Sequence, residues 1–128
     1  KEKIRVGTLY RKIFKNYFNF SQVPPKNFYS VHWLNSIILD ELNSNEVKKV
    51  GEKLMQVGIE VRSGFWPLIN TKHIKSIFVG KEKVSERNYK KVIVLPSNYT
   101  LKKKDILFIR NQLVKIIKSV KPNINLNK

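Results

Sequence analysis

Apolar residues recur at helical spacing near the end of the chain, between Thr100 and Pro122. Three or four residues separate most neighbouring members of this set, which comprises Ile106, Ile109, Leu113, Ile116, Ile117 and Val120. Thr100 is predicted to cap the helix and Pro122 to end it. Just upstream, residues 92–96 read VIVLP, a short apolar run typical of a buried strand that ends at proline. An amphipathic helix must bury its apolar face, and a buried strand must be covered on both faces. This region therefore predicts helices packed on a sheet.

The upstream half adds elements of the same kind. A first helix is indicated by an apolar set at helical spacing: Val6, Leu9, Tyr10, Ile13, Phe14 and Tyr17. Residues 28–40 are rich in aromatic and β-branched side chains, which favours a strand that would include His32. The first helix has no predicted cap at Lys1, which suggests that it continued upstream of this residue.

The second helix has clear start and stop signals. Asn43 and Glu46 have the spacing of a capping box, and Gly58 would end the helix by adopting the left-handed backbone conformation. Its buried positions are predicted to be Val47, Val50, Leu54 and Val57. A short strand over 59–62, an irregular segment over 63–80 and a short helix over 85–91 complete the order. Together the elements predict an α+β fold with a small sheet covered by helices, whose exposed edges or faces would need a partner.

Composition limits the function classes. A chain of 128 residues that is 41% hydrophobic can form one compact domain. The absence of cysteine excludes disulfides, zinc–thiolate sites and thiol catalysis. No apolar run approaches the length of a membrane span and no secretory leader is evident, so we expect a cytoplasmic protein without a membrane partner.

The net charge of +17 raises nucleic acid as a partner. Lysine supplies most of it, with 21 Lys against 5 Arg scattered along the chain, which is also typical of a solvated basic surface. The low number of acids, nine in all, would also be explained by an acidic partner domain. Motifs of the common nucleic-acid-binding modules are missing, and the run Lys102–Lys104 is interpreted as a solvated helix start.

Catalytic and metal-binding patterns are also missing from the sequence. Two histidines and two aspartates without cysteine do not make a metal cluster, so no metal site is predicted. No glycine-rich phosphate loop or nucleophile elbow is present. His32 is interpreted as packed or hydrogen-bonded, and the adjacent Asp40 and Glu41 as favouring a helix dipole. We therefore predict no catalytic residue in this chain.

Two segments resemble a known enzyme family. Residues 55–68, MQVGIEVRSGFWPL, are similar to a segment of the DegT/DnrJ/EryC1/StrS aminotransferases that usually reads "gIetRpgFyPL". Residues 85–109 resemble the closing segment of that family, with Leu95-Pro96, a turn, Thr100 and the final helix in the same order. The stretch SVHWLNSIIL looks like the first strand of the family's small domain, so the resemblance covers about residues 1–120.

The resemblance implies the C-terminal small domain of a fold-type I transferase that uses pyridoxal phosphate (PLP). Residues 1–20 would be the end of the helix that joins the two domains, 21–121 the small domain, and 122–128 a frayed tail. Members of the family transfer an amino group, usually from glutamate, onto a keto sugar carried on a nucleotide. They work as homodimers whose cofactor lysine lies in the large N-terminal domain. That domain's motifs are not present here, so the chain alone is expected to be inactive and to need the large domain or a partner chain.

The matched positions also imply the substrate-proximal residues Arg62, Phe65, Trp66 and Asn70. Arg62 could bind an anionic group of the substrate, or form an ion pair at the end of a strand. Phe65 and Trp66 could line the binding site of the sugar or the base, or pack into the core. The family often has His after "PL", where this chain has Ile69 followed by Asn70, so a polar sugar contact there is in doubt. Lys102 follows Ser97 at a spacing that imitates the family's cofactor lysine, but without the glycine-rich sequence that follows it, and is not assigned as catalytic.

Three alternatives remain open at this point. The chain is the end of an aminotransferase, a stand-alone or split part of one that is inactive without a partner, or a small basic nucleic-acid-binding protein. The ordered motifs favour the first two, and charge alone favours the third.

Overall fold

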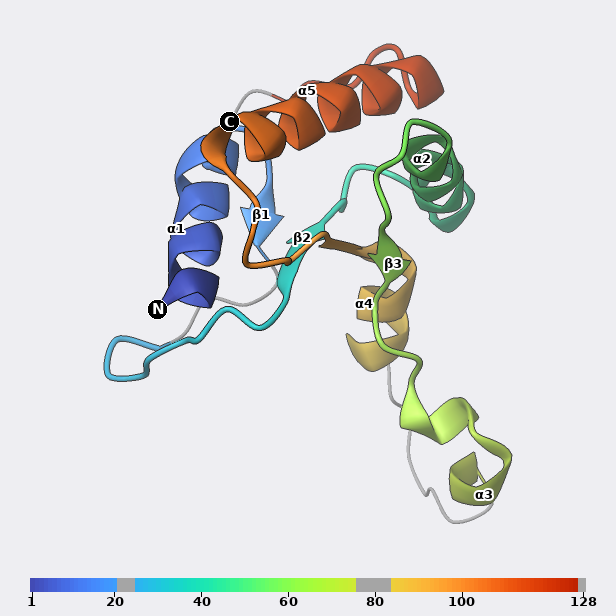
Figure 1. Cartoon of the computed structure of the whole chain (residues 1–128). Coiled ribbons are helices and arrows are strands. Elements are labelled where there is room, and N and C mark those ends of the chain that lie inside the picture. The colour runs from blue at the N-terminus through green and yellow to red at the C-terminus, as the bar shows by residue number, and fades with distance from the viewer. Residues whose placement is uncertain (21–24, 76–83, 127–128) are drawn as a thin grey trace.

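The computed structural model describes residues 1–20, 25–75 and 84–126 (Figure 1). Along the chain the elements are α1 (Glu2–Phe14), β1 (Asn19–Phe20), β2 (Asn35–Ile38), α2 (Ser44–Gln56), β3 (Arg62–Ser63), the 3₁₀ turn η1 (Leu68–Asn70), α3 (Lys72–Lys75), α4 (Val84–Lys91), β4 (Val92–Leu95) and α5 (Lys103–Val120). Part of the segment predicted to be irregular, residues 76–80, lies outside the described residues.

The strands form one antiparallel sheet in the order β1-β2-β4-β3. At its centre Ile37 of β2 pairs with Ile93 of β4, and β3 adds an edge by pairing Arg62 with Val94. All four residues of β4 are buried, as expected for a central apolar strand. The predicted α+β class with a small antiparallel sheet and covering helices is confirmed.

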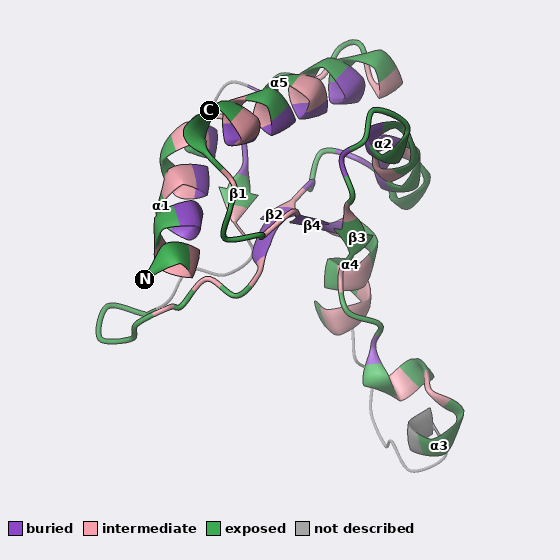
Figure 2. Cartoon of the chain, viewed as in Figure 1, coloured by how far each residue is buried: buried purple, intermediate pink, exposed green. Residues whose placement is uncertain are grey.

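The main core lies between the sheet and helices α1, α2 and α5. Because side chains alternate along a strand, Ile37, Ile93 and Leu95 join this core, and the helices supply the rest (Figure 2). Tyr10 and Leu113 are among its fully buried side chains. The predicted inner faces of the first and last helices are confirmed, with Leu9, Ile13, Tyr17 and Val120 packing at the margin of the core.

The ends of α2 follow the sequence signals. Asn43 accepts the Glu46 main-chain N–H at 3.0 Å, and Glu46 accepts the Asn43 N–H at 2.7 Å, so the capping box is confirmed. Gly58 has φ +78, and the N–H of Ile59 reaches the Leu54 carbonyl at 2.9 Å, which makes a Schellman end. Val57 is 43% exposed, so its predicted burial is wrong, because the helix has already ended at this residue.

The predicted strand over 28–40 is wrong for most of its length. Only Asn35–Ile38 pairs, because β4 and β1 offer partners to these residues alone. His32 has φ +50, a left-handed conformation that a strand does not contain. Its ring packs against α1 at Gly7, and its Nδ1 lies 3.2 Å from the Ser30 hydroxyl, so the packed, hydrogen-bonded interpretation holds.

The other short elements shift by a few residues. The predicted strand over 59–62 forms at Arg62–Ser63, because Ile59 takes part in the Schellman turn. The short helix and the VIVLP strand are confirmed as α4 and β4.

Thr100 does not cap the last helix. Its N–H is held in a turn by the Asn98 side chain at 3.0 Å, so α5 begins three residues later. Asp105 instead accepts the N–H of Lys102, the residue before the helix, at 2.8 Å.

The tail after Pro122 was expected to be frayed. Leu126 is only 8% exposed and Ile124 packs beside the core, so the described part of the tail is held by apolar contact. Residues 127 and 128 lie outside the described residues. Within the described ranges, no helix combines the length and apolar character needed to cross a membrane.

Candidate functional site

The segment with the four expected substrate-proximal residues begins at the end of α2. After the turn at Gly58, Ile59 enters the core and anchors the chain at 4% exposure. The chain then runs along the sheet edge as β3, and Pro67 is buried again. Between these two anchors the side chains of residues 60, 62, 63, 65 and 66 are exposed. The local sequence thus presents a short, fixed stretch of polar and aromatic groups.

Gly64 allows this stretch to lie directly on α4. A Cβ at Gly64 would be 3.1 Å from the Asn88 carbonyl oxygen and from the Tyr89 Cα, both backbone atoms. The Gly64 N–H donates to the Val92 carbonyl at 3.1 Å, which fixes the approach. Glycine is therefore needed here for close packing of two backbones.

Trp66 and Tyr89 form the aromatic centre of the site. Their ring centroids are 5.0 Å apart at 85°, an edge-to-face contact. Trp66 remains 54% exposed and Phe65 70% exposed, so neither ring packs into the core. Tyr89 was missed in the sequence because a lone tyrosine in a short polar helix gives no signal until its partner is known.

Arg62 lies at the sheet edge and pairs with Glu60 at 3.1 Å. Both side chains are more than 70% exposed, and such surface pairs contribute about 0–1 kcal/mol. The ion pair at a strand end is therefore formed, but an incoming anion could replace it at small cost. Arg62 also lines an open hollow between α2, β3 and α4, where Met55 and Val61 provide apolar surface and Tyr89 another wall.

Asn70 is set apart from this hollow. It ends the 3₁₀ turn, where its N–H donates to the Pro67 carbonyl at 3.0 Å, and its side chain is exposed. Tyr89 lines this hollow together with Arg62 and contacts the Trp66 ring, whereas Trp66, Phe65 and Asn70 do not themselves line the hollow.

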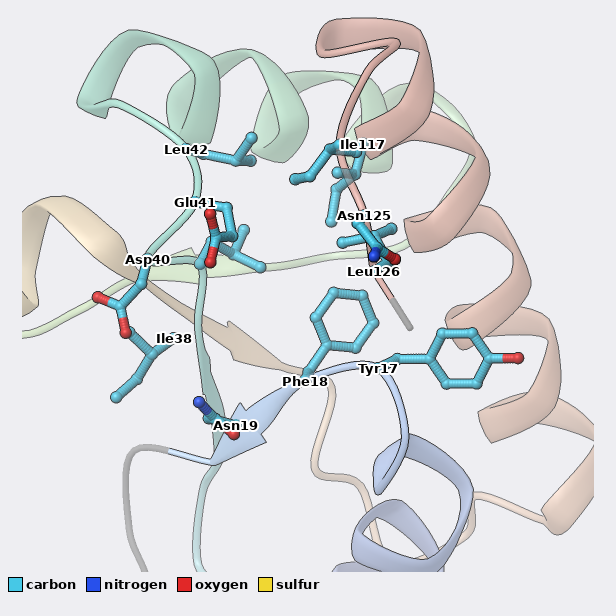
Figure 3. Close-up of a pocket in the computed structure, with 12 residues that line it drawn as sticks. Tyr17, Phe18, Asn19, Ile38, Asp40, Glu41, Leu42, Ile117, Asn125 and Leu126 are labelled. Carbon is cyan, nitrogen blue, oxygen red and sulfur yellow. The ribbon is translucent and has the colours of Figure 1, made fainter. Parts of the chain in front are cut away.

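A second, small cavity of about 30 Å³ lies on another side of the molecule. Figure 3 shows that its walls come from the link after α1, the link before α2, α5 and the tail, with Phe18 and Ile117 among the apolar groups. It contains none of the expected substrate-proximal residues. Because Leu126 and Leu42 in its wall belong to the core, we interpret it as a gap under the tail.

A Schiff-base lysine needs to line the pocket that holds PLP, and a metal site needs several ligating side chains close together. Lys102 is exposed at the start of α5 and lines none of the hollows described above, so it does not fit the role of a Schiff-base lysine. Within residues 1–20, 25–75 and 84–126, no three or more His, Asp or Glu side chains gather as metal ligands.

Comparison with solved structures finds the same fold in parts of several aminotransferases. Helicobacter pylori PseC, an aminotransferase of pseudoaminic acid biosynthesis, matches with a TM-score of 0.78 and 22% identity over 92% of this chain and 32% of its own. The chain has the fold of one third of a sugar aminotransferase. A Streptococcus pneumoniae protein described as a sugar aminotransferase matches at 0.79 and 14% identity, covering 93% of this chain and 31% of its own.

A DegT/DnrJ/EryC1/StrS aminotransferase from Brucella abortus matches at 0.67 and 20% identity, over 92% of this chain and 30% of its own. No protein-family model and no curated protein sequence matches the chain. The chain spans about a third of the length of the solved structures that it matches, and the likeness confirms the fold that the sequence resemblance implied.

Proposed function

We propose that the chain is the C-terminal small domain of a PLP-dependent aminotransferase of the DegT/DnrJ/EryC1/StrS family that acts on nucleotide-linked keto sugars. The observation that carries the proposal is the match of 92% of the chain to 32% of PseC, at a TM-score of 0.78. The motif around Arg62, which resembles the family in sequence, occupies an exposed edge of this fold. Motif and fold are separate observations that point to the same family.

Exposed aromatic side chains support the proposal that another domain covers part of this chain in the full protein. In the link between β1 and β2, Phe28, Tyr29 and Trp33 are each at least 68% exposed. Tyr99, in the turn before α5, is 60% exposed. A small domain that docks on a large domain would cover such groups, whereas a solitary domain leaves them in water.

The full enzyme would supply PLP, its lysine and the amino-donor site from the large domain, and glutamate is the donor that the resemblance implies. When bound, PLP supplies the electron sink for transamination. The residues of this chain would act on the substrate side. Arg62 would bind an anionic group of the sugar nucleotide, and Trp66, which contacts Tyr89 in the wall of the Arg62 hollow, would exclude water on that side. Phe65 and Asn70 would contact the substrate outside this hollow.

The first experiment is the intact mass of the native cellular protein after borohydride reduction. A mass of about three times the 15.1 kDa of this chain with a pyridoxyl adduct is expected, since the chain corresponds to 32% of PseC. A mass near 15.1 kDa without an adduct would contradict a single-chain enzyme and favour a split part that needs a partner chain.

The second experiment tests Arg62 in that native protein. Arg62→Gln is expected to raise KM for the sugar nucleotide about tenfold, because a charge-assisted contact is lost. Arg87→Gln is the matched control, since Arg87 is exposed on α4 and does not line the Arg62 hollow. Equal KM values for both variants would refute a role of Arg62 in substrate binding.

A further inference from the structure

A groove runs between α1 and α5 on a different part of the surface from Arg62. Its volume is about 820 Å³, including space open to solvent. Cations and apolar groups share its wall, which includes Lys12, Lys103, Arg110, Leu9, Ile13 and Tyr17. We call it the α1–α5 groove. None of its lining residues is acidic.

The three cations are placed by helical spacing. Lys103 and Arg110 are seven residues apart on α5, which sets their Cα atoms about 10 Å apart along one face. Lys12 faces them from α1. In the described part of the chain, none of the three takes part in an ion pair. Like charges held together without carboxylates create a positive potential that attracts anions.

Arg110 is already ordered for binding. Its guanidinium carbon lies 5.3 Å from the centroid of the Tyr17 ring, a cation–π contact across the two helices. Its Nε and Nη2 donate to the Asn111 side chain at 3.1 and 2.7 Å. Of the five guanidinium N–H groups, three remain for a ligand. Fixing the guanidinium in advance lowers the entropy cost of binding.

The N-terminus of α5 adds to the positive potential at one end of the groove. Lys103 is the first residue of this 18-residue helix, where the helix dipole favours negative charge. Asp105 lies nearby, but it does not line the groove, and its carboxylate accepts the Lys102 main-chain N–H.

We propose that the α1–α5 groove is a binding site for a phosphate-bearing anion with more than one phosphate group. Three cations in one groove match several negative charges better than the single charge of a carboxylate. Guanidinium and ammonium groups are both common ligands of phosphate. The source of the phosphates is either a small diphosphate or the backbone of a nucleic acid, and both offer neighbouring phosphate groups. The site is independent of the aminotransferase proposal.

The test uses the 128-residue chain and inorganic pyrophosphate as the probe in isothermal titration calorimetry. We expect saturable binding at one site, and a loss of affinity of about tenfold or more in the double variant Lys12→Gln with Lys103→Gln. The matched control is Lys72→Gln with Lys118→Gln, which removes two exposed charges outside the groove. Its affinity should stay within about twofold of the parent, since only the diffuse field of the protein changes.

Three outcomes overturn the proposal: pyrophosphate does not saturate, the control pair weakens binding as much as the groove pair, or the groove pair has no effect. Far-ultraviolet circular dichroism of each variant checks that the fold is retained, which is expected because Lys12 and Lys103 are exposed. A competition arm with a twelve-base-pair DNA duplex identifies the source. Displacement of pyrophosphate from the parent by the duplex, together with direct duplex binding that is weaker in the groove pair than in the control pair, assigns a nucleic-acid backbone. Pyrophosphate binding that the duplex does not displace assigns a small diphosphate.

Discussion

Replacing Gly7 by alanine tests the packing of His32 against α1. A Cβ at Gly7 would lie 2.3 Å from His32 Cγ and 2.4 Å from His32 Cβ. These atoms are close to the backbone, so rotating the imidazole does not relieve the clash and the link around His32 has to move. Overpacking of this kind costs about 1–3 kcal/mol. Alanine in a helix interior gains about 1 kcal/mol over glycine, which leaves a net loss of up to about 2 kcal/mol.

Urea unfolding followed by tryptophan fluorescence measures this loss. Gly7→Ala is expected to lower the midpoint, with the m-value unchanged if the denatured state is the same. Gly51→Ala is the matched control, because its Cβ would meet the Val61 side chain at an ordinary 3.8 Å. This control is expected to gain up to about 1 kcal/mol from helix propensity alone.

His32→Gly completes a double-mutant cycle. Removing the ring opens the space for a Cβ, so Gly7→Ala should become neutral or stabilising in that background. Glycine also removes the cost of the left-handed conformation at φ +50. If Gly7→Ala raises stability as much as the Gly51 control while His32 is present, the close packing described here is wrong.

Three further predictions follow from single contacts. Gly64→Ala should cost about 1–3 kcal/mol, because its Cβ would press on the Asn88 carbonyl, and an unchanged urea midpoint would contradict that contact. Asn43→Ala should cost about 1 kcal/mol by removing the cap of α2, and Asn43→Asp should retain most of it in the same assay. Burial raises the pKa of the Tyr10 phenol above its ordinary value of about 10, so stability is full below that pH and falls above it by up to about 1.4 kcal/mol per pH unit. Tyr10→Phe should lose about 1 kcal/mol of stability at neutral pH, because the hydrogen bond to the Pro96 carbonyl is removed. The variant should also lose less stability than the parent as the pH rises above about 10. An equally steep loss of stability in the variant would refute the assignment to Tyr10.

The candidate site was only partly visible in the sequence. The motif around Arg62 identified one continuous stretch, because close neighbours in sequence stay close in any fold. The contact of Trp66 with Tyr89 joins residues from two elements, and its existence depends on Gly64 bringing the chain onto α4. The α1–α5 groove joins positions 12, 103 and 110, and no local pattern connects them.

What the sequence determined by itself is mainly local. Helical apolar spacing, the capping box at Asn43 and the glycine at 58 specified the helices, because hydrogen bonds within a few residues and one buried face decide them. The VIVL strand was equally clear, since a short continuous apolar run is stable only when buried. The tertiary structure decided the rest. Residues 28–34 have high strand propensity but lie outside the sheet, because strand pairing needs a partner and β1 and β4 reach only Asn35–Ile38. Leu126 is buried for a similar reason: a hydrophobic side chain in a tail is held only where a distant part of the fold leaves a gap for it.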